Sequence, residues 1–418
     1  MMGGRFRSVR WWYIAAAVLA VGTAGTYQFS WPAIRGALGA HASASGTELG
    51  AVFSVLVVAE TLTAFPAGWI RDRYGPRLPF FVAAALLFGG FVGVSFVPSL
   101  PALYLWFALG GAGMGIAYDV AINTPSRWFV SRRGMATGAV SMAFSGTSFL
   151  LIPFIKSAVE TSFSPTLFVL GVAAGITGVI AGLVIHDSEE EWDDESDTTA
   201  DSKGDSSKGD GSKDDDPMTA ESAVIGSNVT WRTMVRSRRF WLLYVLFAVV
   251  NGVGLVLVEK VIVYATHLGL SVTAATAAAS MVALGQATGV IVIGTASDRL
   301  GRERTLAGSV VCCGIALTAL VVSGGMGLQW VFVALAWLTM FFRAPSFSIL
   351  PGLVGEYYGE EYSSENYAVM LTAKLWGGIY GGLVASLLVI RIGWSPTFLL
   401  SAGLAFVAGV IALVFLRS

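Results

Sequence analysis

Apolar stretches of about twenty residues follow one another along most of the chain. They form two groups of six, near 11–34, 48–70, 78–97, 102–128, 135–158 and 165–186, then near 240–264, 273–297, 305–323, 328–352, 364–390 and 394–416. A helix needs roughly 20 apolar residues to cross a hydrocarbon layer of about 30 Å. The pattern therefore predicts an all-α membrane protein with twelve transmembrane helices in two six-helix halves, at 1–186 and 239–418.

The composition agrees with this pattern. Of the 418 residues, 55% are apolar and only 13% are charged, whereas about a quarter are charged in an average soluble domain. The first apolar run starts at Trp11, after three arginines, and is too long for the core of a signal peptide. We expect it to be retained as the first span.

A polar segment at 187–238 separates the two groups of spans. Its first part, 187–221, holds fifteen Asp or Glu residues against three Lys residues. Such a segment buries too little apolar surface to fold, so we expect an acidic, disordered linker on the cytoplasmic side. A solvated tether and a regulatory or partner-binding segment are both compatible with it.

The distribution of Lys and Arg predicts the orientation. Of the 26 basic residues, twenty lie on the side of the termini and the linker, and three lie inside spans. The other three, Arg35, Lys156 and Arg391, lie on the opposite side. Loops rich in Lys and Arg stay in the cytoplasm. We therefore expect a multi-pass protein of the cytoplasmic membrane with both termini in the cytoplasm.

One short charged loop occurs twice, as "GWIRDRYGPR" at 68–77 and as "GTASDRLGRER" at 294–304. Four residues match at a constant offset of 226, namely Gly68, Asp72, Arg73 and Gly75 with Gly294, Asp298, Arg299 and Gly301. The chain is therefore a duplicated six-helix unit, as in transporters built from parallel halves. Gly75 and Gly301 suit a tight turn between helices because glycine adopts conformations closed to other residues.

The loop pattern G-x-x-x-D-R-x-G-R resembles the cytoplasmic loop signature of the major facilitator superfamily. The resemblance covers essentially the whole chain, and it implies that the loop latches one half against the other. The residues that would carry this gating role are Gly68, Asp72, Arg73, Gly75, Asp298, Arg299, Gly301 and Arg302. An aspartate can also sit at a helix N-terminus, and the arginines can act simply as anchors at the cytoplasmic face.

Four charged residues fall near the middle of predicted spans: Glu60, Asp119, Arg343 and Lys374. A charge at the bilayer centre costs at least about 2.5–3.5 kcal/mol, so each is a functional candidate. In one interpretation the two acids only neutralise the two bases across the seam between halves. In the other, the cations bind an anionic substrate and a carboxylate carries a coupling proton. Glu259 and Lys260, near the outer end of span seven, are expected to form an interfacial pair.

Several segments resemble one branch of this superfamily, the oxalate/formate antiporters and monocarboxylate transporters. They are "GTYQFSW" (25–31), "NTPSRWFVSRRGMATG" (123–138), "VYATHLGLS" (263–271) and "NYAVMLTAKLWG" (366–377). In that branch a lysine in a T-A-K setting binds the substrate carboxylate, which assigns this role to Lys374. The branch usually has an arginine in span eight, whereas this chain has none near Val290. We infer that Arg343 supplies the second positive charge.

The resemblance and the midspan charges together indicate a secondary active transporter of a small organic anion, most simply a monocarboxylate. It would work by alternating access, with proton symport or anion exchange. Five further residues are candidates to line the path, although each can equally be a packing residue. They are Tyr27, Gln28, Tyr118, Trp376 and Tyr380.

The alternative is proton-coupled efflux of a cationic or amphipathic compound, with Glu60 and Asp119 as the substrate acids. The Gly-Pro signature of many drug exporters is not evident at 138–154. A membrane sensor that does not transport has no feature in its favour. The sequence shows no nucleotide loop, catalytic triad spacing or metal cluster, so we expect no enzyme activity, no cofactor, no metal and no nucleic acid. The expected partners are the anionic substrate, a possible coupling proton and the lipid bilayer, and the expected state is a monomer.

Overall fold

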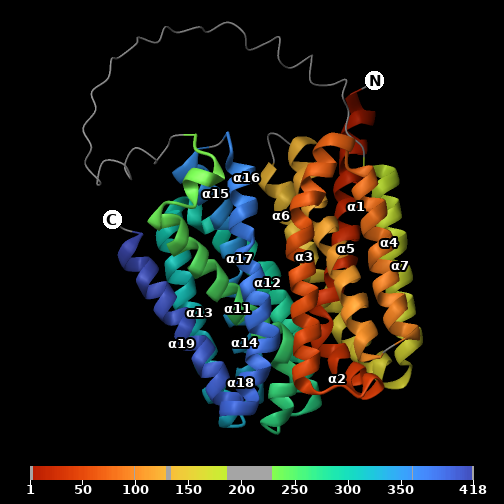
Figure 1. Cartoon of the computed structure of the whole chain (residues 1–418), viewed down its shortest axis with the longest axis vertical. Helices are drawn as coiled ribbons and strands as arrows, with labels where there is room; N and C mark the ends of the chain where they lie inside the picture. The colour runs from red at the N-terminus through yellow and green to blue at the C-terminus, as the bar shows by residue number, and fades with distance from the viewer. Residues whose placement is uncertain (1–2, 98, 129–132, 186–227, 360, 417–418) are drawn as a thin grey trace, which may run out of the picture.

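The structure is a computed structural model that describes residues 3–97, 99–128, 133–185, 228–359 and 361–416 (Figure 1). Side chains at 3–10, 72, 123–137 and 364 lie outside the described set. Among the described residues the secondary structure is helical, and no strand occurs. The segment 123–138, one of those that resemble the transporter branch, therefore has no described side chains before residue 138.

The first half consists of helices α1 (Gly3–Phe29), α2 (Trp31–Ala42), α3 (Gly46–Tyr74), α4 (Arg77–Phe96), α5 (Leu100–Trp128), α6 (Arg133–Thr161) and α7 (Phe163–Val184). The second half consists of α10 (Trp231–Met234), α11 (Arg238–His267), α12 (Val272–Leu300), α13 (Arg302–Gly325), α14 (Gln329–Arg343), α15 (Ser346–Tyr358), α16 (Ser363–Leu371), α17 (Ala373–Ile379), the π-helical turn η3 (Tyr380–Val384), α18 (Ala385–Ile392) and α19 (Trp394–Phe415).

Eleven helical segments of the described chain are long and apolar enough to cross a membrane. Helix α1 is not among the eleven, but it packs lengthwise against α5, α6 and α7 and completes the first half (Figure 1). With α1 the described chain has twelve spans, six in each half. The predicted fold class is therefore confirmed.

Three of the predicted spans are interrupted. The first breaks at Ser30, two residues before Pro32, and the tenth breaks at Ala344 and Pro345 into α14 and α15. Proline removes a backbone donor and its ring clashes with the preceding turn, so a helix restarts there. The eleventh span consists of α16, α17, η3 and α18.

Part of the predicted disordered linker is folded. Residues 186–227 lie outside the described set, but 228–238 contact the second half. The backbone N–H of Val229 donates to Tyr358 O at 3.0 Å, and Asn366 Nδ2 donates to Val229 O at 2.9 Å. Met234 in α10 is fully buried. Residues 228–238 are therefore ordered against the second half, through the hydrogen bonds of Val229 to α15 and α16 and the burial of Met234.

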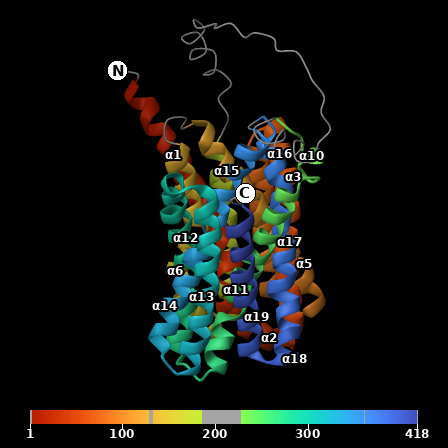
Figure 2. The same cartoon turned by 90° about the vertical axis from the view of Figure 1, so that its left-hand side faces the viewer.

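The two halves meet along a seam formed by three pairs of helices. Helix α3 packs against α17 and η3, α6 packs against α12, and α2 packs against α11 (Figures 1 and 2). We call the end with the turns at 75–76 and 301 the linker end. The end with the turns at 43–45 and 268–271 is the far end.

Candidate functional site

An ion pair joins the two halves at the middle of the membrane span. Glu60 lies at the centre of α3, and its Oε1 accepts a hydrogen bond from Lys374 Nζ of α17. The Glu60 side chain is 4% exposed and that of Lys374 is 12% exposed. Gln28 Nε2 of α1 donates to the other carboxylate oxygen of Glu60 at 3.3 Å. The carboxylate therefore has one charged partner and one neutral partner.

The second midspan cation, Arg343, is held by neutral groups. Its Nη1 donates to Gln286 Oε1 at 2.7 Å and its Nη2 donates to Asn251 Oδ1 at 2.6 Å. Its Nε donates to Val250 O at 3.4 Å, and the side chain is 4% exposed. Because an amide oxygen accepts hydrogen bonds without carrying a charge, Arg343 is fixed in place and its positive charge is not cancelled.

One aromatic ring lies beside both cations. The centroid of Phe347 in α15 is 4.7 Å from Arg343 Cζ and 5.9 Å from Lys374 Nζ, within cation–π distance of each. Such a ring interacts favourably with positive charge in a water-poor setting. We refer to these groups as the central cluster: Gln28, Glu60, Asn251, Gln286, Arg343, Phe347 and Lys374.

Arg343 lies close to the part of span eight where the resembling branch usually has an arginine. Gln286 lies on α12 four residues before Val290, so the two share one helix face. Arg343 extends from α14 and places its guanidinium beside α12, one helical turn from Val290. Asn251, Gln286 and Phe347 were not predicted as site residues. Their type gives no signal in the sequence, since amides and a phenylalanine are common in any span.

The Asp119 carboxylate lies on the linker-end side of Glu60. An ideal Cβ built on Gly68 would be 3.2 Å from Asp119 Oδ2, and Gly68 is eight residues beyond Glu60, or about 12 Å along α3. The interpretation that Glu60 and Asp119 neutralise Lys374 and Arg343 is therefore correct only for Glu60 and Lys374. The amides of Gln286 and Asn251 take the place that it gave to Asp119. Tyr118 lies within electrostatic range of Glu60, Asp119 and Arg343, beside the central cluster.

Three of the predicted aromatic residues lie away from the cluster. Tyr27 is 1% exposed, donates to Trp106 O at 2.8 Å and packs on rings of its own half. Tyr380 shares a hydrogen bond with Ser401 Oγ of α19 at 2.9 Å. Trp376 is 57% exposed. It lies about 200° around the helix from Gly378, which faces α3, so Trp376 is directed away from the seam. Their prediction as substrate-lining residues is not supported, because each points into its own half or away from the seam.

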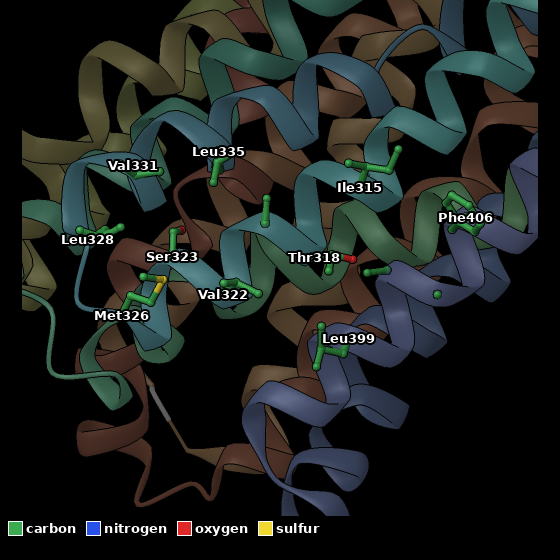
Figure 3. Close-up of a pocket in the computed structure, with 13 residues that line it drawn as sticks. Ile315, Thr318, Val322, Ser323, Met326, Leu328, Val331, Leu335, Leu399 and Phe406 are labelled. Carbon is green, nitrogen blue, oxygen red and sulfur yellow. The ribbon is translucent and has the colours of Figure 1, made fainter.

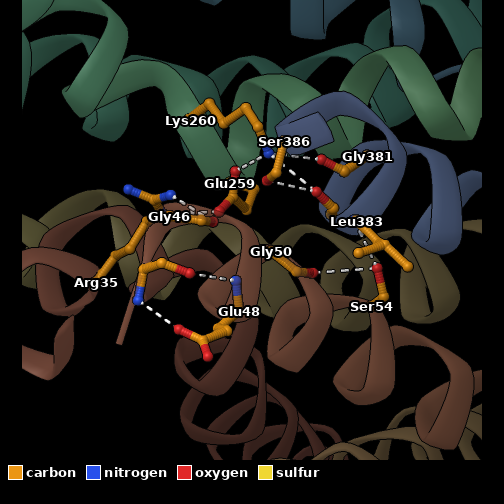
Figure 4. A network of polar contacts seen from close by, with 12 residues as sticks. Arg35, Gly46, Glu48, Gly50, Ser54, Glu259, Lys260, Gly381, Leu383 and Ser386 are labelled. Carbon is orange, nitrogen blue, oxygen red and sulfur yellow. Dashed lines mark hydrogen bonds and ion pairs between the residues drawn. The ribbon is translucent and has the colours of Figure 1, made fainter. Parts of the chain in front are cut away.

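A second charged group closes the seam at the far end (Figure 4). Arg35 Nε of α2 donates to Glu259 Oε1 of α11 at 2.7 Å, and Lys260 Nζ donates to Glu259 Oε2. The Glu259 side chain is 0% exposed and that of Lys260 is 1% exposed. The predicted Glu259–Lys260 pair is present, but it is buried between the halves instead of lying at a membrane interface, because Arg35 of α2 contacts Glu259 and η3 contacts Lys260. We call Arg35, Glu259 and Lys260 the far-end cluster.

Next to this cluster, a serine side chain of the first half hydrogen-bonds to the backbone of a helix of the second half. Ser54 Oγ of α3 donates to Gly378 O at 2.9 Å and accepts from the backbone N–H of Leu383 at 2.9 Å. These two backbone groups are five residues apart; Gly378 precedes the π-helical turn η3 and Leu383 lies within it. Lys260 Nζ also donates to Gly381 O and Gly382 O of that turn, at 3.1 and 3.2 Å (Figure 4). The irregular turn is thus stabilised from both sides of the seam.

The duplicated loops form matching turns at the linker end. Gly75 and Gly301 have φ angles of 76° and 88°, so the predicted need for glycine is confirmed. Arg302 Nη1 donates to Glu356 Oε1 at 2.7 Å and Arg302 Nη2 donates to Asp298 Oδ1 at 3.3 Å. These partners all belong to the second half. The Asp72 side chain lies outside the described residues, and the gating role of the loops stays a prediction.

The remaining loop residues lie at the surface. Arg73 is exposed, with its guanidinium 5.4 Å from the Trp69 ring centroid, and Arg299 is exposed beside Asp298. Gly68 packs against Asp119, as described above, and Gly294 packs against Ser348. Both glycines allow a close approach of the neighbouring helix, so the two copies of the loop share this packing role.

An apolar groove lies on the membrane-facing side of the second half, between α13, α14 and α19 (Figure 3). It has a volume of about 680 Å³ and its lining includes Ile315, Val322, Met326, Leu335 and Phe406. The residues that line it, all within the described part of the chain, include no charged side chain. It is therefore unsuited to hold an anion, unlike the central cluster.

Comparisons with known proteins agree with this architecture. A family model described as the Major Facilitator Superfamily matches residues 13–259 and 251–418. The chain is 26% identical to the oxalate:formate antiporter of Oxalobacter formigenes, over 96% of this chain and 90% of that protein. It is 33% identical to monocarboxylate transporter 11 of Mus musculus, over 26% of this chain and 25% of that protein.

A solved structure shows the same fold. A crystal structure of the nucleoside transporter NupG superposes with a TM-score of 0.71, covering 97% of this chain and 99% of that one, at 11% sequence identity. At this identity the likeness concerns the arrangement of the helices and not the substrate. Sequence relatives and the structural neighbour thus agree on a membrane transporter fold with two halves.

Proposed function

Because the chain belongs to the Major Facilitator Superfamily, we propose that it is a secondary active transporter of a small organic anion, a monocarboxylate or a related carboxylate. The anion crosses along the seam by alternating access, coupled to proton symport or to anion exchange. The protein acts as a monomer in the cytoplasmic membrane. Both of its termini lie in the cytoplasm, an orientation that the distribution of Lys and Arg favours.

The observation that carries this proposal is the excess of positive charge at the middle of the seam. Lys374 and Arg343 lie near one ring, and of these two cations Lys374 is the one that hydrogen-bonds to Glu60. Buried charge without a matching counter-charge is costly, so an anion entering the cluster gains a favourable interaction. Lys374 also keeps 12% of its side chain exposed. The antiporter of oxalate and formate and the monocarboxylate transporter named above support the same class of substrate.

The far-end cluster supports alternating access. Arg35–Glu259 and the Ser54 hydrogen bonds join the halves between the central cluster and the far end. An anion can leave or enter on that side only after these contacts separate. Closure at the linker end in the opposite state then falls to the duplicated loops, which fits the role predicted for them.

The test is uptake by purified protein in liposomes. Radiolabelled formate, acetate, lactate, pyruvate and oxalate are offered with and without an inward proton gradient. We expect uptake of at least one monocarboxylate, and its loss in Lys374→Ala because one of the two cations is removed. Lys156→Ala is the matched control, since Lys156 pairs with Glu160 on one exposed helix face, and it should transport normally. Dependence on the gradient separates symport from exchange.

Failure has a defined meaning. If folded wild-type protein takes up no acid of the panel, anion transport is contradicted, and efflux of cationic compounds through Glu60 and Asp119 becomes the function to test. Equal uptake by wild type and Lys374→Ala also contradicts the proposal, because the central cluster would then not bind the transported anion.

A further inference from the structure

The central cluster contains more positive than negative charge. Glu60 contributes one negative charge, while Lys374 and Arg343 contribute two positive charges, so the three groups sum to +1. Asp119 is not counted in this sum, because its Oδ2 lies beside Gly68, eight residues beyond Glu60 on α3. The groups that hold Arg343 are the neutral amides of Gln286 and Asn251.

From this balance we infer that Glu60 is a specificity-determining residue, which limits the transported anion to a single negative charge. The inference rests on the proposed function and concerns the same site. An anion of charge −1 brings the cluster to neutrality. A dianion leaves an excess negative charge in a region that is 4–12% exposed, where unbalanced charge is unfavourable.

The geometry leaves each cation able to bind a carboxylate. Three of the guanidinium N–H groups of Arg343 have protein partners, and the group has five in all. Each terminal nitrogen therefore keeps one N–H that can donate to a carboxylate oxygen. Lys374 has three N–H donors, of which one is directed to Glu60. A dianion with two carboxylates would match both cations if Glu60 carried no charge.

Glu60→Gln tests this directly. The amide keeps the shape of the side chain and can still accept from Lys374, but it raises the sum of charges to +2. We expect the ratio of initial uptake rates of oxalate to formate at pH 7 to rise at least about tenfold over wild type, since a tenfold ratio corresponds to only about 1.4 kcal/mol. Malonate against acetate should change in the same direction. Glu60→Asp, which keeps the charge, should keep the wild-type ratio.

Asp119→Asn is the matched control, because it also removes one carboxylate from a span of the first half, outside the central cluster. It should leave the oxalate-to-formate ratio within about twofold of wild type, well below the tenfold expected for Glu60→Gln. An equal rise in both variants would overturn the inference, since the effect would then follow from overall charge and not from Glu60.

A binding measurement decides the case in which Glu60→Gln binds but does not transport. Thermal stabilisation of the purified variant by oxalate is compared with that by formate, each at the same ionic strength. Stronger stabilisation by oxalate than in wild type supports the inference. Folded Glu60→Gln protein with an unchanged preference, in uptake or in stabilisation, overturns it while leaving anion transport intact. Absence of any anion uptake in wild type contradicts the proposed function itself.

Discussion

The central cluster and the far-end cluster contain the same charges in different arrangements. Each combines one glutamate with one arginine and one lysine, and each joins the two halves of the molecule. At the far end both cations contact Glu259, and further donors are directed to the carbonyls of Gly46, Gly381 and Gly382. In the central cluster one of the two cations, Lys374, contacts the glutamate, whereas Arg343 is held by amides.

This difference separates a closure from a binding site. A cluster whose donors are directed to one carboxylate and to backbone carbonyls is satisfied by the protein alone and stabilises the contact between the halves. A cluster that holds one cation by neutral groups keeps positive charge available for an incoming anion. The charge composition of a cluster therefore does not show whether it closes the seam or binds an anion. The partners of each cation distinguish these two roles. Three changes at the far end test this distinction.

The largest effect is expected from Glu259→Gln. It removes the carboxylate shared by two buried cations, and breaking a buried pair typically costs about 3–5 kcal/mol. The closed far end should become less populated. A cysteine at Ser386, in a chain with Cys312 and Cys313 changed to alanine, reports this, because Ser386 is 5% exposed and packs on Gly50. Its labelling by a maleimide should speed up by about a hundredfold.

Lys156→Gln provides the comparison for that variant. It breaks an ion pair with Glu160, whose side chain is 55% exposed, and exposed pairs contribute at most about 1 kcal/mol. Labelling of the cysteine at 386 should change little. Similar labelling rates in the Glu259→Gln and Lys156→Gln chains would show that the far-end cluster does not hold the halves together.

A smaller effect is expected from Gly50→Ala. An added Cβ would overlap Ser386 Oγ and lie 2.5 Å from Gly382 O, so α3 and η3 could not approach as closely. Overpacking of this kind costs typically about 1–3 kcal/mol. We expect the closed state to lose population in spectroscopic distance measurements across the seam. Gly36→Ala is the control, since an added Cβ there meets nothing within 4 Å; equal distances in both variants would contradict the prediction.

The smallest effect is expected from Ser54→Ala. It removes the hydroxyl that joins Gly378 O and Leu383 N–H, and a hydrogen bond of this kind contributes about 0.5–1.5 kcal/mol net. Labelling at position 386 should rise only a few-fold. Ser309→Ala removes a buried hydroxyl that bonds within its own helix, to Leu306 O, and should have no effect on labelling. A rise as large as that of Glu259→Gln would mean that η3, and not the far-end cluster, holds this end closed.

The sequence by itself determined the features that depend on composition along the helix axis. Twelve spans, the duplication at an offset of 226 and the turns at Gly75 and Gly301 follow from apolar length, repetition and the conformational freedom of glycine. The midspan depth of Glu60 and Lys374 follows in the same way, since each residue advances a helix by about 1.5 Å.

Only the tertiary structure decided which charges meet. Spans that are apolar on all sides carry little signal about which face is directed to which neighbour, so depth was predictable and direction was not. Asp119 and Glu60 are both acids inside spans of the first half, yet it is Glu60 that hydrogen-bonds to Lys374, while the Asp119 carboxylate lies beside Gly68. Arg35 and Glu259, 224 residues apart, form a pair because α2 packs on α11. The partners of a buried charge are set by how the helices are rotated and packed, which no local pattern in this sequence encodes.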